Sequence, residues 1–454
     1  MRSLFVTVCL CLASSPSRAA PTSDTWSLEK LIAAARTNDS RVKSASADLK
    51  VLQAKYDEAR WAWFPKIDST FFLAGPTPEA RNNGLGGPPT TVATKMYDLN
   101  FGQPGVMMGA EASGVLPIYT WGKLEALETL AAKGVQVGAA LQTRAADEAE
   151  FQTTEAYWGL QMARGGRKSL VEALGRLDDA TKTLQRLREQ KSEQVTAMDT
   201  YKLEFLRREV EAKAGAAESG EQLALRALKT LTGVQGELTV LDEELPEPGG
   251  NPQPVEVYQA MAQRNRPEMR AIDAGLAARE REVFIRERMY LPDLGLAGFF
   301  RWKWTTSATR QLSPFAYDPY NDLSAGVALV VHQTWDFPSK SAQLDQSRGE
   351  LEKLEYQRDL LVAGVNLEVQ QAHGNLAEAL TRANKHTQAE RAARRWATSA
   401  FAAFDVGTTD TRDVFESFTA WAVASGEKIQ AWHDVQVSLG SLSKAAGARI
   451  ELVH

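Results

Sequence analysis

The chain has 454 residues, of which 44% are hydrophobic and 24% charged, and its formal net charge is −5. This composition is normal for a folded protein, and a mildly acidic balance without a long basic run argues against a nucleic-acid partner. No two of the five histidines stand at metal-binding spacing, and the sequence contains neither a phosphate loop nor a dinucleotide fingerprint. The sequence therefore predicts no metal site and no cofactor.

Residues 1–19 have the features of a secretory signal peptide. Arg2 precedes an apolar run from Leu4 to Ala13, and small residues surround the expected cleavage site after Ala19. The two cysteines, Cys9 and Cys11, lie in that run, so we expect a mature chain without disulfides. Beyond it, no apolar stretch reaches the roughly 20 residues of a spanning helix, so a mature chain that crosses a membrane must do so as a closed β-barrel.

The rest of the chain is a tandem duplication. One constant shift in residue number maps the helical segment 26–64 onto 255–291 and Pro65 onto Pro292. A second constant shift maps Trp121 onto Trp335 and Gly233 onto Gly447. We therefore expect a signal peptide at 1–19, a first repeat at 20–233, a linker at 234–253, a second repeat at 254–447 and a tail at 448–454. Each repeat is predicted to contain a helix of about 37 residues ending at proline, two strands, a helix of about 65–70 residues, and a last helix of about 35.

Alternation with period two predicts the strands. The residues that share one face are Ile67, Ser69, Phe71 and Leu73; Val106, Met108, Ala110, Ala112 and Leu116; Leu294, Leu296, Phe300, Trp302 and Trp304; and Leu323, Ala325, Val327, Leu329 and Val331. Runs of about ten residues with one apolar face suit a membrane barrel. A soluble hairpin packed on helices has the same alternation and would make Phe300, Trp302 and Trp304 core residues. The strand context favours the other interpretation, in which they form a membrane-interface girdle.

The second repeat shows how the long helices are joined. Gly407 can end one helix, and Thr409, Asp410 and Thr411 can cap the next, which predicts a tight reversal between two antiparallel helices. Seven-residue spacing predicts coiled-coil packing in two rows, Val414, Trp421, Val435 and Leu442, and Phe418, Trp432, Leu439 and Ala446. A helix of about 65–70 residues spans roughly 100 Å, a length that favours assembly over a globular monomer.

This layout resembles the TolC-type outer-membrane efflux proteins, the outer membrane factors. The residues that carry the resemblance are Val406-Gly407-Thr408 with Asp413 and Glu416 after them, Asn38 and Asn265 before the second part of each first helix, and Leu116-Pro117-Ile118-Tyr119 before Trp121-Gly122-Lys123. The resemblance implies an α+β membrane protein, a homotrimer whose helical hairpins form an α-barrel tunnel and whose four strands per chain build one twelve-stranded β-barrel. It implies an exit duct for efflux or type I secretion, without enzymatic activity. The implied partners are outer-membrane lipid, a periplasmic adaptor and an inner-membrane pump.

The same resemblance implies the functional residues. It places an acidic pore constriction at Asp199, Asp413 and Glu416, and adaptor-contacting tips at Val195, Val406, Gly407 and Thr408. Two positions depart from the family. Thr409 stands where an arginine is usual, so an arginine latch requires Arg412 instead, and Glu193 stands where the first tip usually has glycine.

Two other functions compete with the duct. One is a secreted periplasmic coiled-coil scaffold with short hairpins and no channel activity. The other is a periplasmic hydrolase using a Ser-x-x-Lys pair, at Ser441 and Lys444 or at Ser27 and Lys30. Because both pairs lie at helix ends without further catalytic motifs, the sequence favours chance matches.

Overall fold

The computed structural model describes residues 25–82, 88–91, 103–189, 196–313, 315–406 and 408–452. The helices are α1 (Leu28–Asn38), α2 (Ser40–Arg60), α3 (Lys123–Glu189), α4 (Ala197–Thr232), α5 (Val255–Asn265), α6 (Pro267–Arg288), α7 (Phe337–Asp405) and α8 (Thr411–Ala446). The strands are β1 (Lys66–Thr77), β2 (Ala80–Arg81), β3 (Thr90–Thr91), β4 (Gly105–Tyr119), β5 (Asp293–Thr305) and β6 (Asp322–His332). The expected signal peptide lies outside the described residues.

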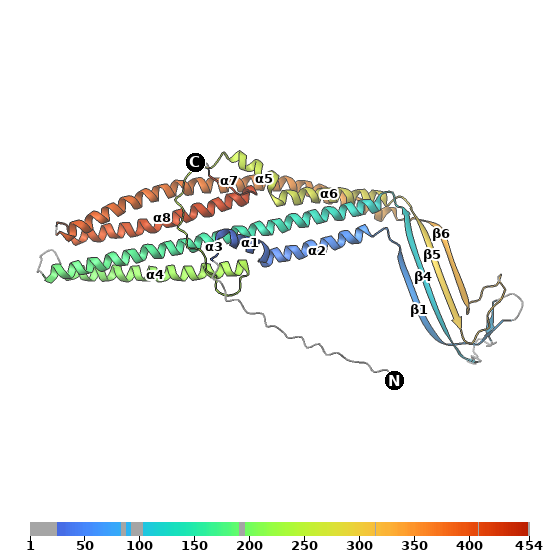
Figure 1. Ribbon diagram of the computed structural model, residues 1–454. Helices are drawn as coiled ribbons and strands as arrows, with labels where there is room; N and C mark the ends of the chain where they lie inside the picture. The colour runs from blue at the N-terminus through green and yellow to red at the C-terminus, as the bar shows by residue number, and fades with distance from the viewer. Residues whose placement is uncertain are drawn as a thin grey trace, which may run out of the picture.

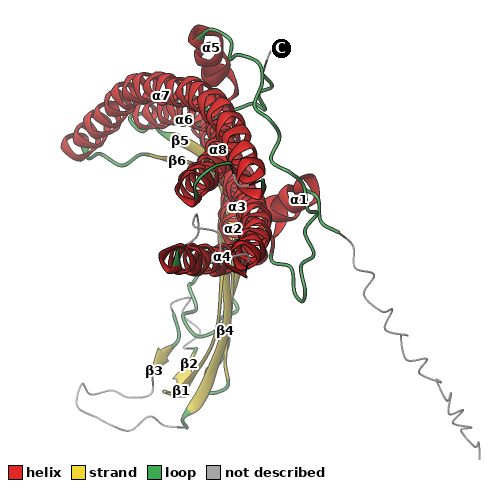
Figure 2. Ribbon diagram, turned by 90° about the vertical axis from the view of Figure 1, so that its left-hand side faces the viewer, coloured by secondary structure: helices red, strands yellow, loops and turns green. Residues whose placement is uncertain are grey.

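The molecule is a long helical body with a sheet at one end (Figure 1). Viewed along the long axis, the helices form a curved row instead of a closed bundle (Figure 2). On the side of the hairpin tips the order is α4, α3, α8, α7, and on the side of the sheet it is α2, α3, α6, α7. Helices α2 and α4 therefore lie at one edge of the row and α7 at the other.

The element bounds repeat along the chain. Helix α1, from Leu28, recurs as α5, from Val255, and α4, from Ala197, recurs as α8, from Thr411. The last helix of each repeat ends at a glycine with positive φ, Gly233 at 67° and Gly447 at 68°. Glycine adopts this left-handed conformation without steric cost, which explains why both helices stop there.

The prediction of one helix over 26–64, and of another over 255–291, was wrong. In the first repeat, Asp39 breaks the helix because its carboxylate accepts the Arg41 N–H at 2.8 Å and begins α2 as an N-cap. In the second repeat, the break falls at Arg266 with Pro267 as the first residue of α6, where a proline lacks only a hydrogen bond that the position does not need.

The predicted lengths of the long helices are confirmed, at 67 and 69 residues for α3 and α7 and 36 each for α4 and α8. The heptad rows of α8 form the core of the second hairpin. Trp421, Val435 and Leu442 are at most 1% exposed, and they pack toward α7 and α3. The coiled-coil packing inferred from the spacing is therefore present within one chain.

The four longer strands form one antiparallel sheet in the order β1-β4-β5-β6. Its register places Phe71, Ala110, Trp302 and Leu323 in one row across all four strands. The adjacent row contains Thr70, Glu111, Arg301 and Ser324. Because successive side chains of a strand point to opposite faces, one face of the sheet is apolar and the other is polar.

Among the residues that the structure describes, none of the helices is both long and apolar enough to span a lipid bilayer.

Candidate functional site: the hairpin tips and the sheet

The first turns of α4 and α8 meet at the end of the molecule opposite the sheet. The Thr411 hydroxyl, at the first residue of α8, donates to Oδ1 of Asp199 on α4 at 2.8 Å. Both side chains are buried, at 5% exposure each. This hydrogen bond joins the two hairpins, although its two residues are far apart in sequence.

Asp199 also accepts hydrogen bonds from the start of its own helix, α4. Its Oδ2 accepts the Thr196 N–H at 2.8 Å and the Thr196 hydroxyl at 2.7 Å, as in a capping box. Burial alone raises the pKa of Asp199, but the hydrogen bonds from Thr196 and Thr411 outweigh burial and hold this pKa below its usual range. The carboxylate is therefore an ionised structural group that holds the tips together.

The two carboxylates predicted on α8 lie on the surface. Asp413 is exposed and accepts the Thr409 hydroxyl at 2.9 Å. Glu416 is half-exposed and pairs with Arg412, one turn before it, at 2.8 Å. The expected substitute for an arginine latch, Arg412, thus contacts its own helix in this chain. Arg412 and Asp413 stand four and three positions before Glu416, so their side chains are neighbours of Glu416 on one face of α8.

The other predicted tip residues surround the reversal between α7 and α8. Val406 is 74% exposed, and the N–H and hydroxyl of Thr408 both donate to the Ala403 carbonyl, at 2.9 and 3.0 Å, which closes the end of α7. Asp410 occupies the N-cap position of α8, but its side chain makes no capping hydrogen bond to the helix. Val195 and Gly407 lie outside the described residues.

Thr411 is the functional candidate that sequence reasoning missed. The sequence predicts Thr411 as one of three possible caps, whereas its hydroxyl donates a hydrogen bond to the other hairpin. The sequence contains one indication of this contact. Asp199 and Asp413 stand at the same place in the two repeats, which puts the starts of both helices at one level of the molecule.

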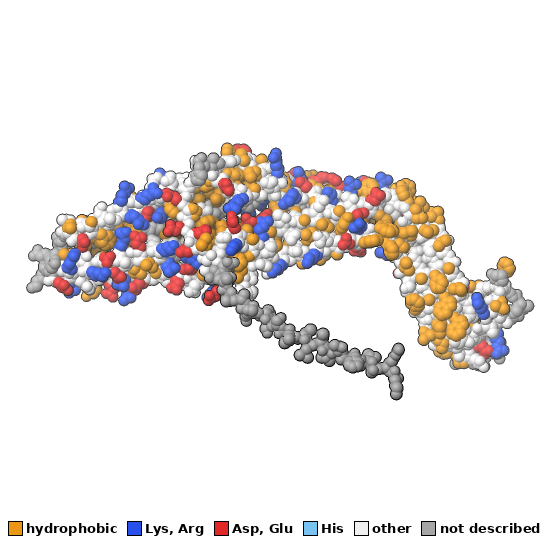
Figure 3. All heavy atoms as spheres, in the orientation of Figure 1, with side chains coloured by type: hydrophobic (Ala, Val, Ile, Leu, Met, Phe, Trp, Pro, Cys, Tyr) orange, Lys and Arg blue, Asp and Glu red, His pale blue; other side chains and the backbone are white. Residues whose placement is uncertain are grey.

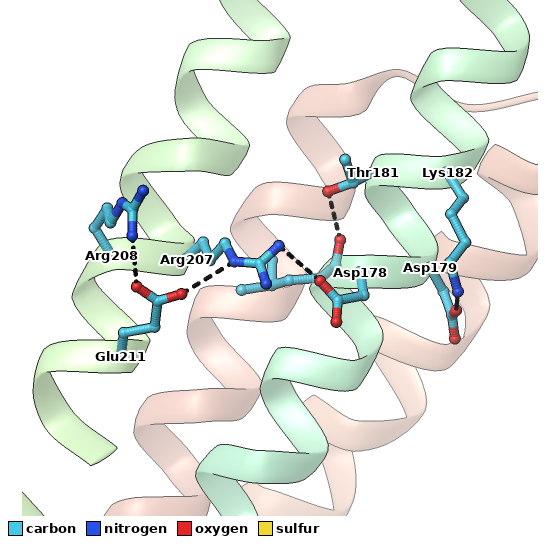
Figure 4. Close-up of polar contacts among 8 residues, drawn as sticks. Asp178, Asp179, Thr181, Lys182, Arg207, Arg208 and Glu211 are labelled. Carbon is cyan, nitrogen blue, oxygen red and sulfur yellow. Dashed lines mark hydrogen bonds and ion pairs between the residues drawn. The ribbon is translucent and has the colours of Figure 1, made fainter. Parts of the chain in front are cut away.

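Ion pairs hold α4 to α3 behind the first tip (Figure 4). Arg207 on α4 contacts Asp178 on α3 at 2.8 Å and Glu211 on its own helix at 3.1 Å, and Arg208 also pairs with Glu211 at 3.0 Å. The two arginines lower the pKa of the Glu211 carboxyl by hydrogen bonding and charge attraction. The first hairpin is thus joined near its tip by charged groups on its surface.

The sheet carries the predicted aromatic residues on its apolar face. Phe300, Trp302 and Trp304 are 44%, 38% and 45% exposed, and hydrophobic side chains gather over the sheet, whereas charged ones are spread over the helices (Figure 3). On the opposite face, Glu111 pairs with Arg301 at 3.4 Å and with Lys303 at 3.3 Å. A large exposed apolar face of this kind marks a surface that contacts a protein partner or a membrane.

The proposed Ser-x-x-Lys pairs are engaged in structural contacts. Lys444 forms an ion pair with Glu148 on α3, and the Ser27 hydroxyl accepts the Lys30 N–H as the N-cap of α1. Among the described residues, no group of three His, Cys, Asp or Glu side chains is arranged to hold a metal ion.

Residues 259–448 match the family of outer membrane efflux proteins. The fold is similar to that of the outer-membrane channel OprN, with a TM-score of 0.72 and 17% identity over 93% of this chain and 90% of that one. It is also similar to the MtrE channel of Neisseria gonorrhoeae, with a TM-score of 0.71 and 15% identity over 93% of this chain and 89% of that one.

The outer membrane protein VceC of Vibrio cholerae gives a TM-score of 0.71 and 16% identity over 93% of this chain and 97% of its own. No curated protein matches the sequence. These findings confirm the resemblance inferred from the sequence: residues 259–448 match the outer membrane efflux protein family, and the chain has the fold of the solved outer-membrane channels.

Proposed function

We propose that three copies of this chain form an exit duct in the outer membrane, with the helices extending into the periplasm. The duct passively conducts substrates delivered by a periplasmic adaptor and an inner-membrane pump of an efflux or type I secretion system. The observation that carries this proposal is the sheet, whose apolar face is exposed and whose outer strands β1 and β6 each pair along one edge only within the described part of the chain. Unpaired strand edges are unstable in lipid, because no water is present to satisfy their polar groups.

The helical row supports the same assembly. It is curved and open, so one chain encloses no tunnel, whereas several chains joined edge to edge would (Figure 2). The 69 residues of α7 span about 100 Å, which suits a duct that reaches far below the membrane. Phe300, Trp302 and Trp304 then belong to the surface that contacts lipid near the interface.

In this proposal the tips form the constriction of the pore, and the three carboxylates at the tips have different roles. Asp413 and Glu416 are on the surface, and three copies of each would form an acidic ring that favours cations. Asp199 is turned toward Thr411 and keeps the two hairpins together. We infer that it joins the ring only when this hydrogen bond opens. Val195, Val406, Gly407 and Thr408 remain the proposed adaptor contact.

Conductance in planar bilayers tests the duct. The purified protein should form pores that select cations, and Asp413→Ala with Glu416→Ala should weaken both this selectivity and block by multivalent cations. The exposed Asp179, which pairs with Lys182 on α3, provides a matched carboxylate control (Figure 4). Unchanged selectivity in the double variant would remove these residues from the constriction, and a protein without conductance that fractionates as soluble would instead support the coiled-coil scaffold.

A further inference from the structure

A pocket of about 390 Å³ lies on the outer side of the helical row. Its walls are α1, the middle of α3, the last third of α8 and the segment 447–450 that follows α8. Helix α1, and α5 with this segment packed on it, lie on the convex side of the row (Figure 2). The pocket is therefore built within one chain, and its volume is in the range of pockets that bind small ligands.

The inner wall of the pocket lies between the hydrophobic cores of the two repeats. On one side, Leu28 of α1 and Trp158 of α3 are partly buried and pack against the core of the first repeat. On the other side, Leu439 of α8 packs against the core of the second repeat. Phe151 of α3 adds a second aromatic ring to the lining. The inner wall is therefore apolar and aromatic.

The space in the pocket depends on Gly440 of α8. A Cβ atom at this residue would lie 3.6 Å from Cδ2 of Phe151 and 3.8 Å from Cγ2 of Thr154, and both of these residues line the pocket. Because these are ordinary van der Waals distances, a longer side chain at this place would extend into the pocket. The equivalent residue of the first repeat is Arg226, so only the second repeat has a residue without a side chain at this place.

Several charged groups around the pocket are paired within the chain. Arg36 of α1 contacts Asp147 of α3 at 3.0 Å, and Lys444 of α8 pairs with Glu148. Burial raises the pKa of the Asp147 carboxyl, although the nearby Arg36 opposes this shift. The surroundings of the pocket are therefore of low polarity, where a polar contact to a ligand is stronger than in water.

Three polar side chains of the lining, in contrast, have no hydrogen-bond or ion-pair partner in the part of the chain that the structure describes. They are Glu29 of α1, Gln436 of α8 and Arg449 of the C-terminal segment. Glu29 and Arg449 are exposed and come from different walls. The pocket thus presents one anion, one cation and one amide around an apolar inner wall.

We propose that this pocket binds a short peptide segment that carries both an amine and a carboxylate. The carboxylate pairs with the Arg449 guanidinium, whose N–H groups match two carboxylate oxygens, and the amine pairs with Glu29. The Gln436 amide donates to and accepts from the peptide backbone. An apolar side chain of the peptide packs on Phe151 and Trp158. The proposal does not depend on the duct, because one chain contains the whole pocket.

The two charges can be the ends of a free peptide or side chains within a longer chain, and two probes distinguish these sources. Isothermal titration calorimetry measures binding to the full-length protein in detergent. One probe is the tripeptide Ala-Phe-Ala with free ends, and the other is Lys-Phe-Asp with an acetylated N-terminus and an amidated C-terminus. We expect at least one of them to bind with a Kd on the order of 100 μM. Binding of the first alone identifies a free peptide, and binding of the second alone identifies a segment of a larger protein.

A variant that fills the pocket tests its location. Gly440→Leu places a side chain in the pocket and replaces a helical glycine by a better helix former, so it should weaken peptide binding by about tenfold or more. Gly426→Leu is the matched control, because Gly426 is exposed on the same helix and a Cβ atom there would contact no other described part of the chain. It should leave the Kd unchanged.

Arg449→Gln, at an exposed position, tests the pairing and keeps the proposal falsifiable if Gly440→Leu does not fold. It should weaken binding of a probe with a free carboxylate roughly fivefold, and hardly affect the same probe with an amide in place of that carboxylate. The proposal is overturned if neither probe binds, or if Gly440→Leu and Gly426→Leu bind equally well. Planar-bilayer conductance of the same samples tests the duct separately, since a conducting protein that binds neither probe would contradict only the pocket.

Discussion

Two equivalent helices, α4 and α8, differ in how they use the same positions. Asp199 on α4 is buried and bridges to the other hairpin, whereas Asp413, its counterpart on α8, is exposed. Two turns further along, Arg207 on α4 pairs with a surface carboxylate, whereas Trp421 at the same place on α8 is 1% exposed.

The difference follows from the place of each helix in the row. Helix α8 lies between α3 and α7, so its side chains are covered on both flanks, whereas α4 lies at the edge (Figure 2). An inner helix can bury aromatic residues, and an edge helix must keep charges in water. The two repeats therefore share one arrangement of helices, and the neighbours of each helix determine which side chains it carries.

Removing the aromatic core of α8 should have the largest effect on stability. Trp421 packs on Phe418, with ring centroids 5.9 Å apart. The guanidinium carbons of Arg176 and Arg394 lie 4.6 and 5.6 Å from the centroid of the Trp421 ring. Trp421→Ala leaves a cavity that costs about 3–5 kcal/mol and should clearly lower the melting temperature. Trp396→Ala on α7, where the ring is 47% exposed, is the control and should change it much less. Equal losses would show that burial at α8 is not what distinguishes the two helices.

Neutralising the two equivalent aspartates tests whether only the buried one stabilises the tips. Asp199→Asn weakens hydrogen bonds to a buried charged group, and we expect a local loss of about 1–3 kcal/mol at the tips. Amide hydrogen exchange should then accelerate in the first turns of α4 and α8. Asp413→Asn at the exposed position should leave exchange in these turns nearly unchanged, and the same acceleration in both variants would count against a special role for Asp199.

Low pH should weaken the contact between the two hairpin tips by protonating Asp199. Because the pKa of Asp199 is lowered in the folded protein, its contribution to stability is complete above the ordinary aspartate pKa of about 3.9. That contribution is lost as the pH falls below this value and through the lowered pKa of the folded state. Protection factors of the first turns of α4 and α8 should therefore fall in this acidic window, and much less so in Asp199→Asn. Identical pH profiles for both proteins contradict this assignment.

The smallest effect is expected at the surface ion pairs of the first hairpin. Arg207→Ala removes contacts to Asp178 and Glu211 that water and salt already screen, so the melting temperature should hardly change (Figure 4). Thermal unfolding in low and in high salt measures this difference. A loss as large as that of Trp421→Ala would mean that charge pairs stabilise the edge helix as strongly as packing stabilises the inner one.

Most of the fold could be predicted from the sequence, because long elements have strong periodicity. The alternation around Trp302 and the heptads around Trp421 predicted the strands and the long helices. The periodicity alone predicted one helix across Asp39, because apolar spacing continues there, whereas the resemblance implied a second part of the helix after Asn38. In the site, the carboxylates could be placed at the tips, but their exposure could not, since it depends on contacts such as that of Thr411 with a helix distant in sequence.

Single-particle imaging of the purified protein in detergent tests the central claim, that the open edges of this chain close into a trimeric duct, most directly. We expect a three-fold cylinder about 140 Å long, from about 100 Å of helix and about 40 Å of membrane-embedded sheet. Its helical wall should be continuous, with α7 of each copy beside α2 of the next. A compact monomer, or a rod without a barrel at one end, would contradict the duct and leave only a coiled-coil scaffold.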